Sequence, residues 1–216
     1  MKNVIINLIF LIFFVTQGVL AEETKAEEKT DSEKKEKETY IEEFVEDFEE
    51  IPGFFKTYRD VEENKVFLEI NEKQLQKEFI YFAHIINGTA VSGMVKGSYV
   101  DEGVFFIEKD FENLRFNRVL TNYYFDEDNP LSKSQGANTS DSTFSVFKIA
   151  AKNEDDDAFL IDVTGLLLSE RLTPIVPIMS PDSYHQGSMS WGQISPTKSR
   201  ILNIHNYEEN TDFQVE

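Results

Sequence analysis

The stretch 51–86, IPGFFKTYRDVEENKVFLEINEKQLQKEFIYFAHII, constrains the fold more than any other part of the chain. Two short runs of aromatic and β-branched residues, 54–58 and 66–70, are separated by the polar link 59–65, which predicts a β-hairpin with a longer loop. Residues 79–86 are apolar at nearly every position, so we expect a third strand that is central and covered on both faces. The stretch therefore predicts a β-rich domain built around these three strands.

The composition limits the class of protein. The 216 residues suffice for one domain plus targeting or linker sequence, and 19 Phe and 8 Tyr provide an aromatic core. A formal net charge of −19 repels phosphate backbones and anionic lipid, so we expect neither nucleic acid nor a membrane surface as a partner. The chain has no cysteine, which excludes disulfides and thiolate chemistry.

The N-terminal residues 1–21 have the pattern of a secretory signal peptide. A basic start at Lys2 precedes an apolar run over 8–15, and Val19 and Ala21 occupy the positions expected before a cleavage site. An uncleaved anchor is the alternative, but the apolar run is short for a spanning helix of about 20 residues. We therefore predict cleavage after Ala21 and a periplasmic or extracellular protein, with no membrane contact beyond the signal peptide.

A Glu/Lys-rich segment, residues 22–38, follows the signal peptide and predicts a disordered linker, because nothing in it can be buried. The β-rich domain is expected over 39–216. An amphipathic helix should open it, starting with a capping box of Thr39 and Glu42 and ending at Pro52-Gly53. We expect its apolar stripe to dock on the domain that follows; the stripe consists of Ile41, Phe44, Val45 and Phe48.

The remaining sequence predicts hairpins. The expected strands are 104–108, 114–125, 144–151, 158–163, 200–204 and one that starts at Phe213. The links are a tight turn, DFEN, a long surface loop over 126–142 and an exposed KNEDDD turn. A short helix is expected over 164–172. The fold class is mainly β (α+β), with antiparallel sheets built of hairpins, one short N-terminal amphipathic helix and one further short helix. Because the last strand has barely begun at Glu216, we expect the domain to be truncated there.

Catalytic motifs are missing from the sequence. Neither H-E-x-x-H nor G-x-S-x-G occurs, and the three histidines, His84, His185 and His205, are far apart in the chain. His84 is either a metal ligand or base, or a half-buried histidine with a hydrogen-bonded ring; the second reading is favoured because no second ligand is spaced nearby. No catalytic, cofactor-binding or metal-binding residue is therefore assigned.

Four blocks resemble the N-terminal part of a family of large secreted bacterial zinc-dependent metalloproteases. The first is GFFKTYRDVEENKVFLEINEKQLQKEFIYFAHI; the others are GVFFIEKDFENLRF, STFSVFKIAAKNEDDDAFLIDVTGLLLSE and SPTKSRILNIHNYEENTDFQVE. In the last block Ser199-Arg200 and Asn210 match a run of that family. The resemblance covers most of the chain from Ile41 onward, in the same order.

The resemblance implies an uncharacterised β-rich N-terminal region that precedes a zincin domain carrying H-E-x-x-H. Zinc is implied for that downstream domain only, because no position here matches its ligands. We therefore expect an exported, non-catalytic module that acts as a scaffold, in substrate docking or like a prodomain, with the protease domain or a protein or peptide substrate as its partner. One alternative is a free-standing periplasmic binding or structural protein, and another is a hydrolase that uses His84 or His185.

Overall fold

The computed structural model describes residues 39–88, 94–122, 126, 128–130, 132, 140–172, 174 and 194–216. All of them belong to one unit, Lys37–Glu216. The predicted signal peptide and Glu/Lys-rich linker lie outside the described residues, as do His185 and most of the loop predicted over 126–142. Among the described residues, no helix has the length and apolar character needed to cross a membrane.

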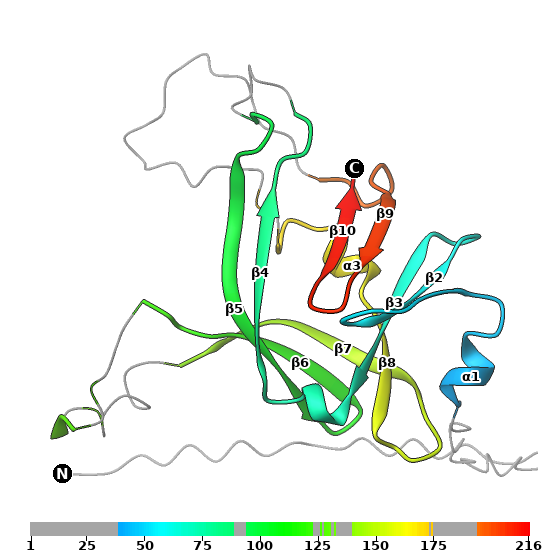
Figure 1. Ribbon diagram of the computed structural model, residues 1–216, viewed down its shortest axis with the longest axis horizontal. Coiled ribbons are helices and arrows are strands. Elements are labelled where there is room, and N and C mark those ends of the chain that lie inside the picture. Colours follow the sequence, from blue (N-terminus) through cyan, green and yellow to red (C-terminus); the bar gives the residue numbers. More distant parts are fainter. Residues whose placement is uncertain are drawn as a thin grey trace, which may run out of the picture. The chain divides into compact units, whose positions relative to one another are not determined.

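Eight antiparallel strands form one curled sheet in the order β1-β2-β3-β8-β7-β6-β5-β4 (Figure 1). In chain order they are β1 (Glu49–Ile51), β2 (Lys56–Asp60), β3 (Lys65–Asn71), β4 (Glu78–His84), β5 (Tyr99–Asp110), β6 (Asn113–Arg118), β7 (Ser142–Lys152) and β8 (Ala158–Asp162). Within this sheet, strands consecutive in sequence pair with each other except β3 and β4, and β3 pairs instead with β8. The predicted mainly β, hairpin-built antiparallel fold is therefore confirmed.

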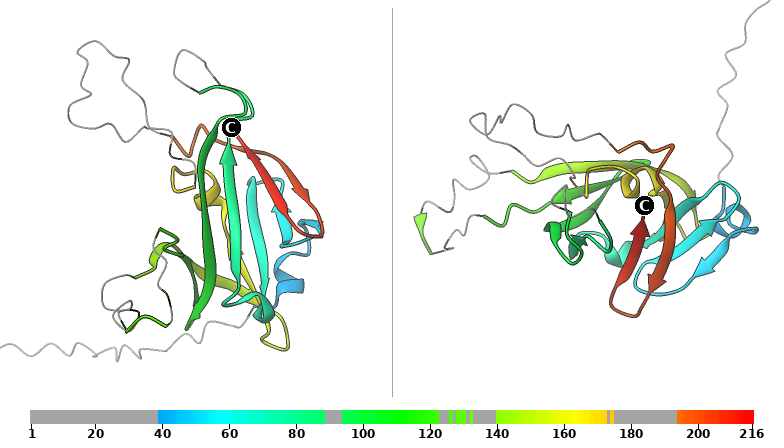
Figure 2. Two further views of the ribbon diagram at one scale, coloured as in Figure 1. Left: turned by 60° about the vertical axis from the view of Figure 1, so that its left-hand side comes forward. Right: turned by 90° about the horizontal axis from the view of Figure 1, so that it is seen from above.

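A second sheet consists of the hairpin β9 (Ile201–Asn206) and β10 (Thr211–Val215). It packs against the core on the concave side of the curled sheet, with Ile201 buried and Ile204 and Phe213 partly buried there (Figure 2). Arg59 of β2 holds it in place, because its guanidinium donates to the carbonyl oxygens of Ile201 at 2.9 Å and Leu202 at 3.4 Å. The strand expected from Phe213 therefore starts at Thr211 and pairs along its length with β9.

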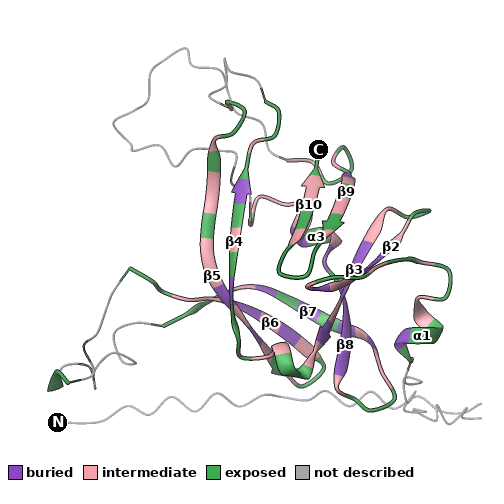
Figure 3. Ribbon diagram, viewed as in Figure 1, coloured by how far each residue is buried: buried purple, intermediate pink, exposed green. Residues whose placement is uncertain are grey.

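The main core lies on the inner face of the sheet. Alternate residues of each strand point inward, and the fully buried ones gather around β3 and β8, including Val66, Ile70 and Ile161 (Figure 3). Aromatic rings extend this core toward β5 and β6, where Phe105 and Phe116 stack at 5.5 Å between centroids. The centre of the fold is thus the pair β3–β8, where both faces of the sheet are covered.

The outer face of β3 and β8 is covered by the chain that precedes β1. Phe44 and Phe48 pack with their ring centroids 5.4 Å from that of Phe67, over Tyr58 and Leu160. The docking expected of the N-terminal aromatic stripe is therefore observed. The helix expected there is wrong in length, since α1 (Ile41–Phe44) is a single turn without a side-chain cap. The segment that follows pairs as β1 with β2, and these ladder hydrogen bonds replace helical ones.

A second expectation is also wrong: the strand read as central, β4, is the edge of the sheet. Its burial alternates: Phe79 and Ala83 are buried and Tyr81 is partly buried, whereas Ile80 and Phe82 are exposed. A continuous apolar run is typical of a strand whose two faces are both covered by other elements. No element among the described residues covers the outer face of β4. The apolar residues of β4 therefore form an exposed surface on one face of an edge strand and not the centre of the core.

Short helices and turns complete the fold. The further helix predicted over 164–172 is the shorter α3 (Thr164–Leu167), whose Leu166 packs into the core. A 3-10 helix, η1 (Glu72–Gln74), links β3 to β4 behind a capping box of Asn71 and Gln74. The predicted hairpin over KNEDDD is confirmed, and Asn153 Oδ1 closes it by accepting from the backbone N–H of Asp157 at 2.9 Å.

Candidate docking surface

The outer face of β4, with the end of β5 beside it, presents apolar side chains to solvent. Ile80 is 68% exposed, Phe82 is 62% exposed and Tyr99 is 75% exposed, and the rings of Phe82 and Tyr99 lie 6.3 Å apart between centroids. Cross-strand pairing puts polar neighbours on the same face. The β4 edge surface, as we call it, consists of Glu78, Ile80, Phe82, His84, Tyr99 and Glu102. Clustered apolar exposure of this kind is typical of interaction sites.

The inner face of β4 explains why these side chains point outward. Phe79 packs in the core against Phe55 at 5.1 Å and Phe105 at 5.4 Å between ring centroids, and Ala83 is buried on the same face. Successive residues of a strand alternate between faces, so burying Phe79 and Ala83 exposes Ile80 and Phe82. The core therefore fixes the orientation of the surface.

A polar network holds β4 to its neighbours. Tyr81 Oη donates to Asp101 Oδ2 at 2.7 Å, and Arg118 Nη2 contacts the same oxygen at 2.6 Å. The Arg118 guanidinium also lies 5.2 Å from the centroid of the Tyr81 ring, while that ring packs on Gly103, where an added Cβ would come within 2.9 Å of it. These contacts link β4 to β5 and β6.

The free side of β4 has no strand neighbour among the described residues. Edge strands usually carry lysine, proline or a bulge that prevents pairing with other chains. The sequence of β4, EFIYFAH, contains neither lysine nor proline, and its only bulge lies at the Ala83/His84 end. As far as the described residues show, the edge is therefore open to a further strand along most of its length.

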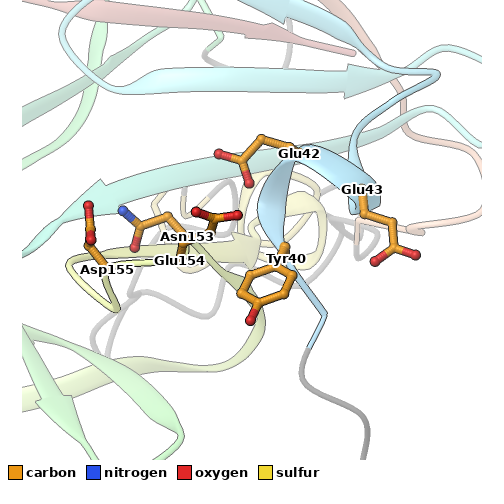
Figure 4. Close-up of a pocket in the computed structure, with 6 residues that line it drawn as sticks. All are labelled: Tyr40, Glu42, Glu43, Asn153, Glu154 and Asp155. Carbon is orange, nitrogen blue, oxygen red and sulfur yellow. The ribbon is translucent and has the colours of Figure 1, made fainter.

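An acidic hollow lies elsewhere, between α1 and the β7–β8 turn. Its volume is about 490 Å³, and Figure 4 shows its lining: Tyr40, Glu42, Glu43, Asn153, Glu154 and Asp155. Four carboxylates face one open space, with Lys152 nearby but engaged with Glu112 and Asp156. Nothing in the hollow points to a particular ligand, and carboxylates on an exposed turn are ordinarily hydrated.

The histidines considered from sequence do not form a site among the described residues. His84 is exposed at the end of β4, so the expectation of a half-buried ring is wrong, and His205 is exposed in β9. No group of three or more His, Asp or Glu side chains in the described part of the chain is arranged to hold a metal ion.

The described residues form a curled antiparallel sheet in which β4 is an edge strand with exposed apolar side chains. Residues 97–216 match the family model described as "Domain of unknown function (DUF5117)", and because this is more than half of the chain, the chain belongs to that family. The matched part begins just before β5, so the folded sheet also includes β1–β4, upstream of the match. Comparisons with curated proteins and with solved structures both give no match.

Sequence reasoning missed the β4 edge surface, although a signal for it is present. The even-numbered positions of β4 begin with Glu78 and end with His84, whereas the odd-numbered positions are all apolar. The β5 residues on the same outer face include Glu102 and Glu108, so charge recurs at intervals on this face. Polar ends on one face of an apolar strand indicate exposure of that face, even when its middle is apolar.

Proposed function

We propose that this chain is a non-catalytic scaffold module of an exported zinc-dependent metalloprotease, and that it binds another protein chain through the β4 edge surface. The observation that carries the proposal is the exposure of Ile80, Phe82 and Tyr99 beside an unpaired strand edge. Burying such side chains contributes about 1.5–3 kcal/mol each, and an added strand gains ladder hydrogen bonds. An interface is therefore the use that best fits this face.

The metalloprotease context rests on the four sequence blocks, which lie in β2–β4, β5–β6, β7–α3 and β9–β10. These blocks include most of the described strands other than β1, so the resemblance extends over several elements rather than one motif. Export rests on the signal-peptide pattern of residues 1–21. The proposal assigns no zinc to the described residues, since zinc belongs to the H-E-x-x-H domain that the resemblance implies.

The test begins with the reading frame that encodes the chain. We expect it to encode an H-E-x-x-H helix after the codon for Glu216, and we expect the purified chain to contain no zinc and to leave casein intact. A gene that encodes no such helix would favour the free-standing periplasmic protein instead, and casein cleavage by the purified chain would favour a hydrolase.

A second experiment tests the scaffold role in the full protease. Ile80→Lys and Phe82→Lys should reduce casein cleavage but leave cleavage of a short peptide unchanged, because the catalytic domain stays intact while its assembly is impaired. Val146→Lys is the matched control, since Val146 is also exposed, on β7 in the interior of the sheet. Equal casein cleavage by all three variants and the unchanged protease would contradict the role.

A further inference from the structure

The seven residues of β4 are complementary to themselves when two copies run antiparallel. With Tyr81 opposite its own copy, Ile80 lies opposite Phe82 and Glu78 lies opposite His84 on the outer face. On the inner face the large Phe79 lies opposite the small Ala83. Apolar thus meets apolar, acid meets imidazole and large meets small in the pairs on either side of the axis, and Tyr81 meets its own copy on the axis.

We propose that the β4 edge surface binds a second copy of this chain, through antiparallel β4–β4 pairing about a two-fold axis at Tyr81. Such an interface is isologous, so each favourable pair occurs twice. The outer face of one copy continues into that of the other, and the exposed side chains of Ile80, Phe82 and Tyr99 form one apolar band across the axis. The pairing also covers the open edge of β4 in both copies.

Charge favours this occupant at the local level. Glu78 and His84 are exposed at opposite ends of β4, and no ion pair engages either residue within the described part of the chain. Antiparallel pairing brings each carboxylate to the partner's imidazole. The net charge of −19 opposes association at long range, but at an ionic strength of about 0.15 M charges are screened beyond about 8 Å. The short-range match therefore decides the pairing.

The proposal deepens the scaffold role, but it does not depend on a protease domain. If the reading frame encodes no H-E-x-x-H helix, the protease context fails while the pairing stands; if the chain is monomeric, the pairing fails while the protease context stands. The two sets of experiments therefore give separate answers.

Sedimentation equilibrium of the purified chain at about 0.15 M salt tests the pairing. We expect reversible association to twice the mass of one chain. Phe82→Lys and Ile80→Lys should each raise the dissociation constant by at least about tenfold, because two like charges then meet near the axis. Val146→Lys should leave it unchanged, and circular dichroism should show all three variants folded. A monomeric unchanged chain, or equal dissociation constants for all variants, would overturn the proposal.

A charge exchange tests the pair at the ends of the strand. His84→Glu should weaken the dimer, because it places two carboxylates opposite each other twice. Glu78→Lys should weaken it less, and the double variant Glu78→Lys/His84→Glu should restore it, because opposite charges then face each other. Additive weakening in the double variant would overturn this pairing.

The register can be tested with cysteines, because the chain has none of its own. Directly opposed residues have Cβ atoms about 4.5–5.5 Å apart, close to the spacing of a disulfide, whereas diagonal neighbours are about 7–8 Å apart. A mixture of Ile80→Cys and Phe82→Cys chains should therefore cross-link under mild oxidation much faster than either variant alone. Equal rates in all three samples would overturn the register. If the unchanged chain is monomeric and binds an extended peptide, the β4 edge binds peptides and the pairing proposal is overturned.

Discussion

A Cβ atom added at Gly53 would lie 2.2 Å from Oδ1 of Asn206, because the Asn206 amide packs directly on the Gly53 backbone. The same amide nitrogen donates to the carbonyl oxygens of Ile51 at 2.9 Å and Phe55 at 2.6 Å. Its oxygen accepts from Thr211 Oγ1 at 2.7 Å. One side chain thus joins the link between β1 and β2 to the β9–β10 hairpin, about 150 residues further along the chain.

Gly53→Ala should lower the free energy of unfolding by about 2–4 kcal/mol, because the methyl group displaces the Asn206 amide from its carbonyl partners. Urea denaturation measures the change. Gly165→Ala is the control: an added Cβ at Gly165 meets nothing within 4 Å, and the residue is helical, so we expect a small gain in stability of about 0.5 kcal/mol. Similar losses for both variants would contradict the contact.

Asn206→Asp should cost about 2–4 kcal/mol, since it keeps the shape of the side chain but removes the donor to both carbonyl oxygens and adds a charge beside them. Asn203→Asp in the same strand is the control, because Asn203 is exposed and its amide bonds only to the Gln214 side chain. We expect a change within about 0.5 kcal/mol there. A small effect at Asn206 would show that its hydrogen bonds contribute little to holding the hairpin.

Stability should fall in alkali because of Tyr58. Burial raises the pKa of its phenol from 10.0 to about 12; the hydrogen bond with Lys56 opposes this rise, and the bond from Tyr58 Oη to Glu69 Oε2, 2.8 Å long, adds to it. A raised pKa in the folded state favours the neutral phenol, so this stabilisation is fully present below pH 10 and is lost as pH rises through about 12.

Tyr58→Phe tests this dependence. It should cost about 1–2 kcal/mol near pH 8, where it removes the bond to Glu69, and its stability deficit should shrink by up to about 2 kcal/mol between pH 10 and 12. Urea denaturation across that range gives the difference. Tyr207→Phe changes an exposed tyrosine, so its free energy of unfolding should depend on pH in the same way as that of the unchanged chain. A constant deficit for Tyr58→Phe would contradict the assigned cause.

Phe111→Asn should stabilise the chain. Phe111 lies in the tight turn between β5 and β6 with a φ of 53° and is 88% exposed, so it bears left-handed backbone strain without contributing packing. Asparagine tolerates this conformation better, and we expect a gain of about 0.5–1 kcal/mol in the free energy of unfolding. Val61→Asn, at an exposed turn residue whose own φ is not positive, should have little effect. Destabilisation by Phe111→Asn would show that the ring makes a stabilising contact.

Most strands could be predicted from the sequence because their signals are local. The runs that became β3, β7 and β8 alternate or cluster in the expected way, and turns such as DFEN and KNEDDD carry the polar residues that turns favour. The N-terminal helix failed because the residues around Glu49 pair with β2, a tertiary contact that outweighs helical periodicity.

The docking surface could not be predicted in the same way. Ile80 and Phe82 have the polarity of core residues, and only the order of strands places β4 at the edge, where nothing among the described residues covers its outer face. Sheet order depends on pairings such as that of Leu68 with Ile161, between residues far apart in sequence. Such long-range pairings leave no periodic signal in either strand.

By itself, the sequence determined the fold class, the antiparallel hairpins and the aromatic residues of the core, because side-chain alternation and turn chemistry act over a few residues. The tertiary structure alone decided that β3 and β8 lie at the centre, that Asn206 closes on Gly53 and that Phe82 faces solvent. These depend on which distant strands meet, and a strand's own sequence is compatible with several neighbours.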